Sequence, residues 1–275
     1  MKNTIVFIGG GNMARSLIGG LIADGCTPGK IWVTDPDQDK LNALQRDYAV
    51  HTATSNHDAV LHAEILVFAV KPQALKIVAC ELGPLAQKHR PLVISIAAGI
   101  RESALSNWLG GNLALVRAMP NTPALVGSGA TAMHANARVS EAQRSQAENI
   151  LRAVGLTLWL TDESQMDAVT ALSGSGPAYF FLVMEALEEA AIRLGLPRDT
   201  AHLLTLETAF GAAKMALESS EDCRALRVRV TSPGGTTEQA LRVLQEGHIE
   251  TLFESALRAA HARSVELAHL LGEST

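Results

Sequence analysis

The sequence predicts an α/β domain with a doubly wound parallel sheet, followed by an all-α domain. Up to residue 162, short β-branched runs alternate with helical stretches, which is typical of parallel strands joined by crossover helices. Beyond that point the strand signal ends, and apolar residues recur at the helical period. The length of 275 residues suits two domains, and we expect them to span 1–162 and 163–275.

Seven strands are expected in the first domain, several of them as continuous apolar runs, because a sheet covered on both faces buries both sides of each strand. They are residues 4–8, 31–34, 65–69, 92–96, 114–117, 130–134 and 157–160. Helices are expected between them, including residues 12–23 and 140–154. Ser140 and Gln143 have the spacing of a capping box at the start of the second of these helices.

Three stripes with spacings of three and four residues predict the helices of the second domain. Their members are Phe180, Met184, Leu187, Ala191 and Leu194; Leu203, Leu206, Phe210, Ala213 and Leu217; and Phe253, Leu257, Ala260, Ser264, Leu267 and Leu271. The Gly-Leu-Pro segment at 195–197 predicts a helix stop between the first two stripes. We interpret the stripes as core or interface packing, including packing across a dimer.

Composition narrows the class of protein. The chain is 47% apolar and 19% charged, with a net charge of −5 and no dense Lys/Arg tract, so nucleic acid is not an expected partner. The longest apolar run, 178–184, is too short to span a membrane, and the N-terminus lacks a signal-peptide pattern. We therefore expect a soluble cytoplasmic protein that acts on small molecules. Its three cysteines are expected to be free and mostly buried, with no metal site.

A glycine motif follows the first strand. Gly9, Gly11 and Ala14 form G-x-G-x-x-A between a strand and a helix. The first glycine permits a tight turn, the second lets the backbone approach a pyrophosphate, and the small third residue lets helix and strand pack closely. The amides at the start of the helix would then face the phosphates. The motif predicts a Rossmann dinucleotide-binding domain.

Asp35 ends the second strand, where an acidic side chain can hydrogen-bond the adenosine ribose of NAD. Asp37 and Asp39 add negative charge, which disfavours the 2′-phosphate of NADP, and only Lys40 could offset it. In the alternative interpretation Asp35 caps the next helix, with Pro36 at its first position.

Further candidates lie at the carboxyl ends of later strands, where open α/β sheets bind ligands. Residues 69–72, Ala-Val-Lys-Pro, and 97–99, Ala-Ala-Gly, are two such segments. Lys71 could instead be a surface lysine at a helix start, and Asn56 could be an ordinary helix cap. Three small, polar segments also stand out, at 119–123, 172–179 and 231–237. The last of them has the character of a carboxylate-binding nest before a helix.

These segments contain three strings: Met-Pro-Asn-Thr-Pro at 119–123, Ser-Gly-Ser-Gly-Pro-Ala-Tyr at 173–179 and Ser-Pro-Gly-Gly-Thr-Thr at 232–237. Together with the glycine loop and residues 69–72, they resemble pyrroline-5-carboxylate reductase along essentially the whole chain. The resemblance implies an N-terminal Rossmann domain and a C-terminal helical dimerisation domain. It also implies reduction of Δ1-pyrroline-5-carboxylate to L-proline by NADPH or NADH, the last step of proline biosynthesis, in a homodimer that can assemble to a homodecamer.

The resemblance also assigns residues. The cofactor positions are Ile8, Gly9, Gly10, Gly11, Asn12, Met13, Asp35, Asn56, Ala69, Val70, Lys71, Pro72, Ala97, Ala98, Gly99, Met119, Pro120, Asn121 and Thr122. The substrate positions are Ser232, Gly234, Gly235, Thr236 and Thr237. Thr237 is the catalytic candidate because it would reach the ring nitrogen, unless it caps the helix that starts near Glu238. The chain departs from the family at Cys223 and at 227–228, where a proline and a Lys-Asp pair are usual.

Two other functions were weighed against this one. A β-hydroxyacid dehydrogenase would need a lysine soon after the glycine-rich turn at 174–176, but Pro177 and Ala178 stand there, and Lys214 lies in another predicted helix. A non-catalytic dinucleotide sensor needs only the glycine loop, and the substrate-type loop at 232–237 argues against it. An imine that is already protonated needs no strong protein acid, which fits the absence of a His/Asp pair from the signature loops.

Overall fold

The computed structural model describes residues 3–272. By packing, the chain divides into two compact units. The first contains the residues up to Ser175 together with those from Ala260 onward, and the second is Gly176–Ala259. Each unit is described here by itself.

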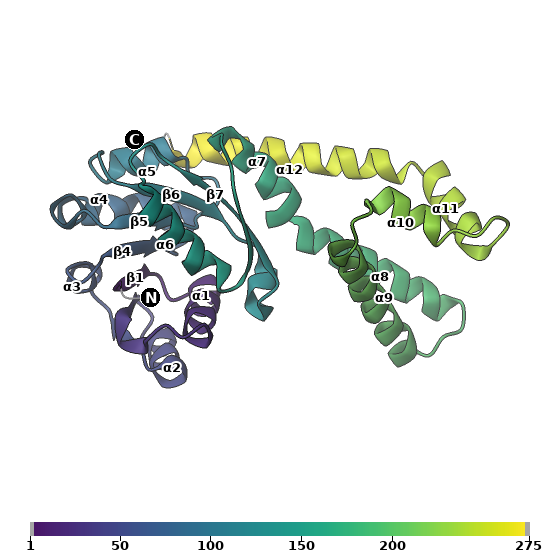
Figure 1. Ribbon diagram of the computed structural model, residues 1–275, viewed down its shortest axis with the longest axis horizontal. Helices are drawn as coiled ribbons and strands as arrows, with labels where there is room; N and C mark the ends of the chain where they lie inside the picture. Colours follow the sequence, from purple (N-terminus) through teal and green to yellow (C-terminus); the bar gives the residue numbers. More distant parts are fainter. Residues whose placement is uncertain (1–2, 273–275) are drawn as a thin grey trace. The chain divides into compact units, whose positions relative to one another are not determined.

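The first unit is built on a single sheet with the strand order β3-β2-β1-β4-β5-β6-β7-β8 (Figure 1). The strands are β1 Ile5–Ile8, β2 Ile31–Thr34, β3 His51–Ala53, β4 Ile65–Phe68, β5 Leu92–Ser95, β6 Leu115–Met119, β7 Gly129–Ala135 and β8 Gly155–Trp159. The seven predicted strands are confirmed within a few residues. The sequence analysis missed β3, because three residues are too few to display an apolar alternation.

The pairing of β6 with β7 corrects the expectation of an all-parallel sheet, because these two strands are antiparallel. Their connection contains only the short helix η2, Thr122–Val126. A parallel crossover needs about a dozen or more residues, so this connection reverses the chain instead. The other pairs are parallel, and the doubly wound α/β class is confirmed.

Helices cover both faces of the sheet. They are α1 Asn12–Ala23, α2 Gln38–Tyr48, α3 Asn56–Val60, α4 Pro72–His89, α5 Glu102–Trp108, α6 Glu141–Arg152 and α7 Met166–Val169. Ile5 and Phe7 of β1 face one buried cluster with α1 and α6, while Val6 and Ile8 face another with α4. The predicted capping box of Ser140 and Gln143 is confirmed at the start of α6.

The end of α12, Ile249–Gly272, packs in the first unit. Ser264 on this helix donates a buried 2.6 Å hydrogen bond to Asp167 of α7. A Cβ built on Gly99 would lie 3.6 Å from the Cβ of Leu267, which places the helix against the 97–99 turn. The first unit is therefore completed by the C-terminal part of α12.

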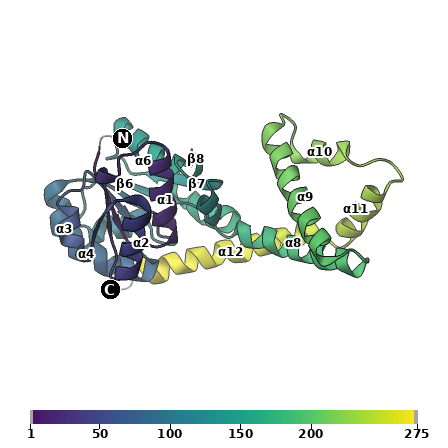
Figure 2. The same cartoon turned by 90° about the horizontal axis from the view of Figure 1, so that it is seen from below.

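The second unit is all-helical. It contains α8 Gly176–Arg193, α9 Arg198–Glu218, α10 Cys223–Arg229, α11 Thr236–Glu246 and the start of α12 (Figure 2). The predicted stop at 195–197 is confirmed between α8 and α9, and Gly195 there has a φ of 101°. The first two predicted stripes are mostly uncovered in the single chain: Phe180 is 67% exposed and Leu194 is 89% exposed.

The expectations about the cysteines and about membrane-spanning segments can be compared directly with the structure. Cys26 is buried, but Cys80 and Cys223 are exposed, so the expectation of mostly buried thiols is wrong. In residues 3–272 no helix combines the length and apolar character that crossing a membrane requires. The same residues contain no group of three or more potential His, Cys, Asp or Glu metal ligands.

Candidate functional site

The glycine turn lies where the strand order reverses, between β1 and β4. Gly9 has a φ of 103°, and a Cβ at this position would come within 2.7 Å of the carbonyl oxygen of Ala69. The Gly9 amide donates to Thr34 and the Ala69 amide donates to Ile8, both at 2.8 Å, so three strand ends meet here. Crevices at this switch point are where doubly wound sheets bind their ligands.

Gly11 precedes α1 as its N-cap and offers no side chain to the first-turn amides. A Cβ on Gly11 would meet no atom within 4 Å, and the first turn carries no acidic residue. The amides of Asn12 and Met13 lie in this first turn, at the positive end of the helix dipole, and no side chain caps them. This arrangement fits the pyrophosphate of a dinucleotide.

Asp35 is fixed beside the glycine turn. It is 8% exposed, and its carboxylate accepts hydrogen bonds from the Gly10 amide at 2.9 Å and from the Asp37 amide at 3.0 Å. The alternative that Asp35 caps the next helix is wrong: Asp37 is the N-cap of α2 and accepts from the amides of Asp39 and Lys40. Asp35 instead connects the end of β2 to the turn that would hold the pyrophosphate.

The surrounding charges are predominantly negative. Hydrogen bonds from the Lys40 and Asp39 amides, together with the Lys40 charge, lower the pKa of Asp37. The charge of Asp35, with a hydrogen bond at 3.4 Å, raises the pKa of Lys40. Lys40 is thus already paired with Asp35 and Asp37, which limits its ability to neutralise a further phosphate.

Asn56 follows β3 and Lys71 follows β4, two strands that β2 and β1 separate in the sheet. Asn56 is not a cap, because Ser55 is the N-cap of α3. The Asn56 Oδ1 instead accepts a 2.6 Å hydrogen bond from the buried Thr34 hydroxyl. Lys71 is the residue before Pro72 at the first turn of α4. Within residues 3–272 its ammonium group has no hydrogen bond or ion pair, so it is available to an anionic ligand.

The 97–99 and 119–122 loops close the other side of this strand edge. The Ala97 amide donates to the buried Ser95 hydroxyl at 3.4 Å. Asn121 donates to the carbonyl and to the hydroxyl of Ser173, both at 3.2 Å. Ser173 lies in a π-helical turn, Thr170–Gly174, and a Cβ on Gly174 would come within 2.4 Å of the Met119 Cε. The 173–179 string is therefore in direct contact with the 119–123 string.

A buried cluster of charged residues, Arg117, Glu163 and Glu102, was not predicted from the sequence. Arg117, 5% exposed, donates to Glu163 at 2.8 Å, and the same Glu163 oxygen accepts from the Glu102 amide at 2.7 Å. Burial, followed by the Glu163 charge, raises the pKa of the Glu102 carboxyl. An arginine within an otherwise apolar strand, Leu-Val-Arg-Ala-Met, was the signal that could have revealed the cluster.

The 232–237 loop precedes α11 in the second unit. The Gly235 amide donates to the Ser232 carbonyl at 3.0 Å, and the Gly234 amide donates to the Glu238 carboxylate at 2.7 Å. The nest thus already holds a carboxylate, from its own helix. Gly235 is the N-cap of α11 and Thr236 its first residue, so the alternative that Thr237 caps the helix is wrong.

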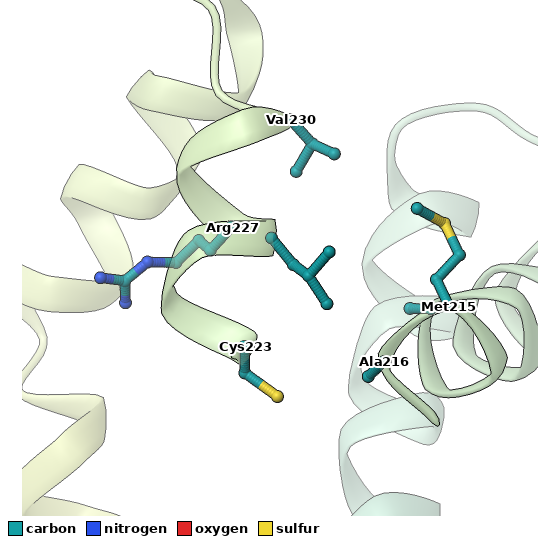
Figure 3. Close-up of a pocket in the computed structure, with 7 residues that line it drawn as sticks. Met215, Ala216, Cys223, Arg227 and Val230 are labelled. Atoms are coloured by element: carbon teal, nitrogen blue, oxygen red, sulfur yellow. The ribbon is translucent and has the colours of Figure 1, made fainter. Parts of the chain in front are cut away.

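The departures at 223 and 227–228 leave the helix before this loop intact. Asp222 caps α10 by accepting from the Ala225 amide at 2.8 Å. In Figure 3, Cys223 of α10 and Val230, the C-cap of this helix, project toward Met215 and Ala216 of α9, while Arg227 extends away from them. All five of these residues, Arg227 included, line an apolar cavity of about 350 Å³ within the second unit.

Comparisons with known proteins cover nearly the whole chain. Residues 163–267 match the family described as pyrroline-5-carboxylate reductase dimerisation, and residues 4–99 match the family described as NADP oxidoreductase, coenzyme F420-dependent. Pyrroline-5-carboxylate reductase from Pseudomonas aeruginosa is 52% identical over 269 residues, 98% of each chain. The Escherichia coli protein of that name is 39% identical over 275 residues, 100% of each chain.

Solved structures agree. A pyrroline-5-carboxylate reductase from Coxiella burnetii has a TM-score of 0.93 and 49% identity, covering 97% of this chain and 99% of its own. The Plasmodium falciparum enzyme, solved with NADP bound, has a TM-score of 0.86 and 28% identity, covering 97% of this chain and 98% of its own.

The glycine turn, the doubly wound sheet and the helical C-terminal region together define an oxidoreductase with a Rossmann-type cofactor domain. Full-length identities of 39% and 52% specify it further. The chain belongs to the pyrroline-5-carboxylate reductase family.

Proposed function

We propose that this chain reduces Δ1-pyrroline-5-carboxylate to L-proline with NADPH or NADH, as the last step of proline biosynthesis. The observation that carries the proposal is the 52% identity with the Pseudomonas aeruginosa reductase over 98% of both chains. Residues 1–162 would form the cofactor domain, and residues 163–275 the dimerisation and substrate domain. This functional division differs from the division by packing, because the end of α12 lies in the first unit.

The cofactor residues of this proposal belong to one strand edge. Gly9 and Gly11 would let the backbone approach the pyrophosphate, the amides from Gly11 to Met13 would bind it, and Lys71 would add a positive charge. Residues 69–72 would contact the dinucleotide, and residues 97–99 and 119–122 would lie beside the nicotinamide, with Asp35 and Asn56 toward the adenosine. When bound, the dinucleotide supplies a hydride to the carbon of the imine.

In the substrate loop, the amides and hydroxyl of 232–236 would hold the substrate carboxylate, and Thr237 would hydrogen-bond the ring nitrogen. The Gly234 amide, now bonded to Glu238, would exchange that carboxylate for the substrate's own. Because the ring nitrogen enters as an iminium, the residues mainly orient it, and orientation can lower a barrier by roughly 7 to 11 kcal/mol.

The test of the proposed function is an assay on the purified, folded protein. Oxidation of NADPH or NADH should depend on added pyrroline-5-carboxylate, and proline should accumulate in equal amount. A protein that binds dinucleotide but leaves the imine untouched with both cofactors would be a sensor and not a reductase.

Asp35→Ser should shift the kcat/KM ratio toward NADPH about tenfold, because removing a like charge near the 2′-phosphate relieves a repulsion of more than about 1.4 kcal/mol. Dissociation constants measured by nucleotide fluorescence should shift in the same direction. Asp39→Ser is the matched control, because it removes the same charge from an exposed residue without a contact to Gly10. Equal shifts in the two variants would leave Asp35 with a structural role only.

Thr237→Ala should lower kcat/KM for the imine about 5- to 150-fold, the equivalent of a lost substrate hydrogen bond of roughly 1 to 3 kcal/mol. Dinucleotide affinity should not change, and Thr237→Ser should retain most of the activity because it keeps the hydroxyl. Unchanged kinetics in Thr237→Ala would remove Thr237 from the site, while complete loss in a folded variant would make it an essential proton donor.

We also propose a cytoplasmic homodimer that can assemble to a homodecamer, with no nucleic-acid or membrane partner. The support is the match to a dimerisation family and the exposed apolar side chains of α8 and α9, Phe180, Leu187, Leu194, Leu203 and Phe210. Activity should follow the dimer population on dilution, measured by light scattering after size exclusion. A monomer with full activity would contradict this.

A further inference from the structure

A second polar cavity lies in the first unit, away from the glycine turn. It has a volume of about 330 Å³ and is lined by Arg90, Asn112, Leu113, Ala114, Arg138 and Gln143. These residues come from the end of α4, the segment before β6, and the turn that leads from β7 into α6. The cavity is at the end of the sheet where β5 and β6 begin, whereas the cofactor candidates follow the strands' carboxyl ends.

Two arginines converge on one residue of this cavity. Arg90 donates from Nη2 to the Asn112 carbonyl at 2.9 Å, and Arg138 donates from Nη2 to Asn112 Oδ1 at 2.7 Å. Asn112 has a φ of 58°, which turns its carbonyl and side chain toward both guanidinium groups. Since each bond uses one of five N–H donors, most of the donors on both arginines remain available.

Neither guanidinium has a carboxylate partner within 4.0 Å among residues 3–272. Glu102 is influenced by the charge of Arg138 but lies beyond ion-pair distance. Glu141, in the first turn of α6, does not line the cavity. In a chain with a net charge of −5, two unpaired like charges held on one residue repel each other, and an anion between them would relieve that repulsion.

Helix α6, which borders the cavity, adds to the positive electrostatic potential of the two arginines. Gln143 lines the cavity from the first turn of α6, a twelve-residue helix whose positive dipole end lies at this turn. Planar guanidinium groups match phosphoryl oxygens in pairs, and two positive charges match a dianion better than a single carboxylate. The volume exceeds what a single oxyanion fills and suits a small metabolite.

We propose that this cavity binds a phosphoryl dianion, either as the free ion or as the head of a phosphomonoester, through Arg90 and Arg138. The site is separate from the proposed reaction and does not depend on it. Its ligand would be recognised by the fork geometry of the two guanidinium groups.

The test is calorimetric titration of NADH-saturated protein with inorganic phosphate, at an ionic strength held constant with chloride. NADH occupies the glycine turn, so phosphate is measured elsewhere. Arg90→Gln/Arg138→Gln should raise the dissociation constant about tenfold or more, because hydrogen bonds to a charged group are lost. The matched control, Arg46→Gln/Arg152→Gln, removes the same charge from exposed arginines of the same unit outside the cavity and should bind as the parent protein does.

An unchanged dissociation constant in the first variant would overturn the proposal, and so would equally tight binding of succinate to the parent protein. If phenyl phosphate binds more tightly than inorganic phosphate, the ligand of the cavity is a phosphomonoester. If the two bind with equal affinity, the ligand is the free phosphate ion. Should the double variant fail to fold, the parent protein provides a second test. Phosphate should protect Arg90 and Arg138 from phenylglyoxal, as detected by peptide mass spectrometry, and equal labelling with and without phosphate would refute the site.

Discussion

Replacing Gly9 by alanine is expected to destabilise the protein by roughly 2 to 6 kcal/mol and to abolish tight dinucleotide binding. About 1 to 3 kcal/mol comes from a φ of 103° that an alanine adopts only under strain. About 1 to 3 kcal/mol more comes from overpacking, since the new Cβ would lie 2.7 Å from the Ala69 oxygen. The Ala69 oxygen and the Gly9 turn both belong to the main chain, so the clash cannot be relieved by moving a side chain.

Gly11→Ala is the matched control for this prediction. Its φ is −72° and its Cβ would meet nothing within 4 Å, so stability should fall by at most about 1 kcal/mol, through a poorer helix cap. Dinucleotide affinity should still fall, because the methyl group would stand where the pyrophosphate approaches. Urea unfolding and nucleotide fluorescence measure the two effects separately. Equal stabilities of the two variants would show that the close approach of Gly9 to β4 does not matter.

Glu163→Ala should destabilise the protein by about 3 kcal/mol, because it leaves the Arg117 charge buried without a partner. The Glu102 amide would lose its acceptor as well. Urea unfolding of the whole chain is the measurement.

Two companion variants separate charge from packing in this cluster. Arg117→Met/Glu163→Leu should recover part of the lost stability, since neither unpaired charge remains, although the Glu102 amide stays without its acceptor. Glu163→Gln should be intermediate, because an amide oxygen can still accept from both donors. A loss below about 1 kcal/mol in Glu163→Ala would mean that Arg117 finds water or another acceptor, and the pair would then count as a surface ion pair.

The regular parts of the fold could be predicted from the sequence. Continuous apolar strands, the turn glycines and the helical stripes are local signals, and each gave an element within a few residues. Strand direction is less local: the residues of β6 and β7 themselves do not show that the two strands are antiparallel, and only the short length of the connection between them does. The helix caps differed by one or two positions, as with Asp37 in place of Asp35, because several consecutive polar residues compete for the same amides.

The candidate site was predictable in its motifs but not in its contacts. The glycine pattern predicted the tight turn between β1 and α1, and Asp35 was predicted at the end of β2, where the structure has it. The bond of Asp35 to Gly10 joins residues 25 apart in sequence, and that of Asn121 to Ser173 joins residues 52 apart. Such pairs carry no periodic signal. The engagement of the Gly234 amide by Glu238 is local, but its consequence for the nest depends on side-chain orientation.

The packing of α12 in the first unit determines when that unit can be finished during synthesis. Asp167 leaves the ribosome 97 residues before its partner Ser264, and the Gly99 turn leaves it about 170 residues before Leu267. At about 5 to 20 residues per second, the nascent sheet waits several seconds or more for its last helix. The cofactor domain is therefore first in sequence order but among the last parts of the chain to be completed. A chain truncated at residue 259 would leave it permanently in the state of a nascent fragment.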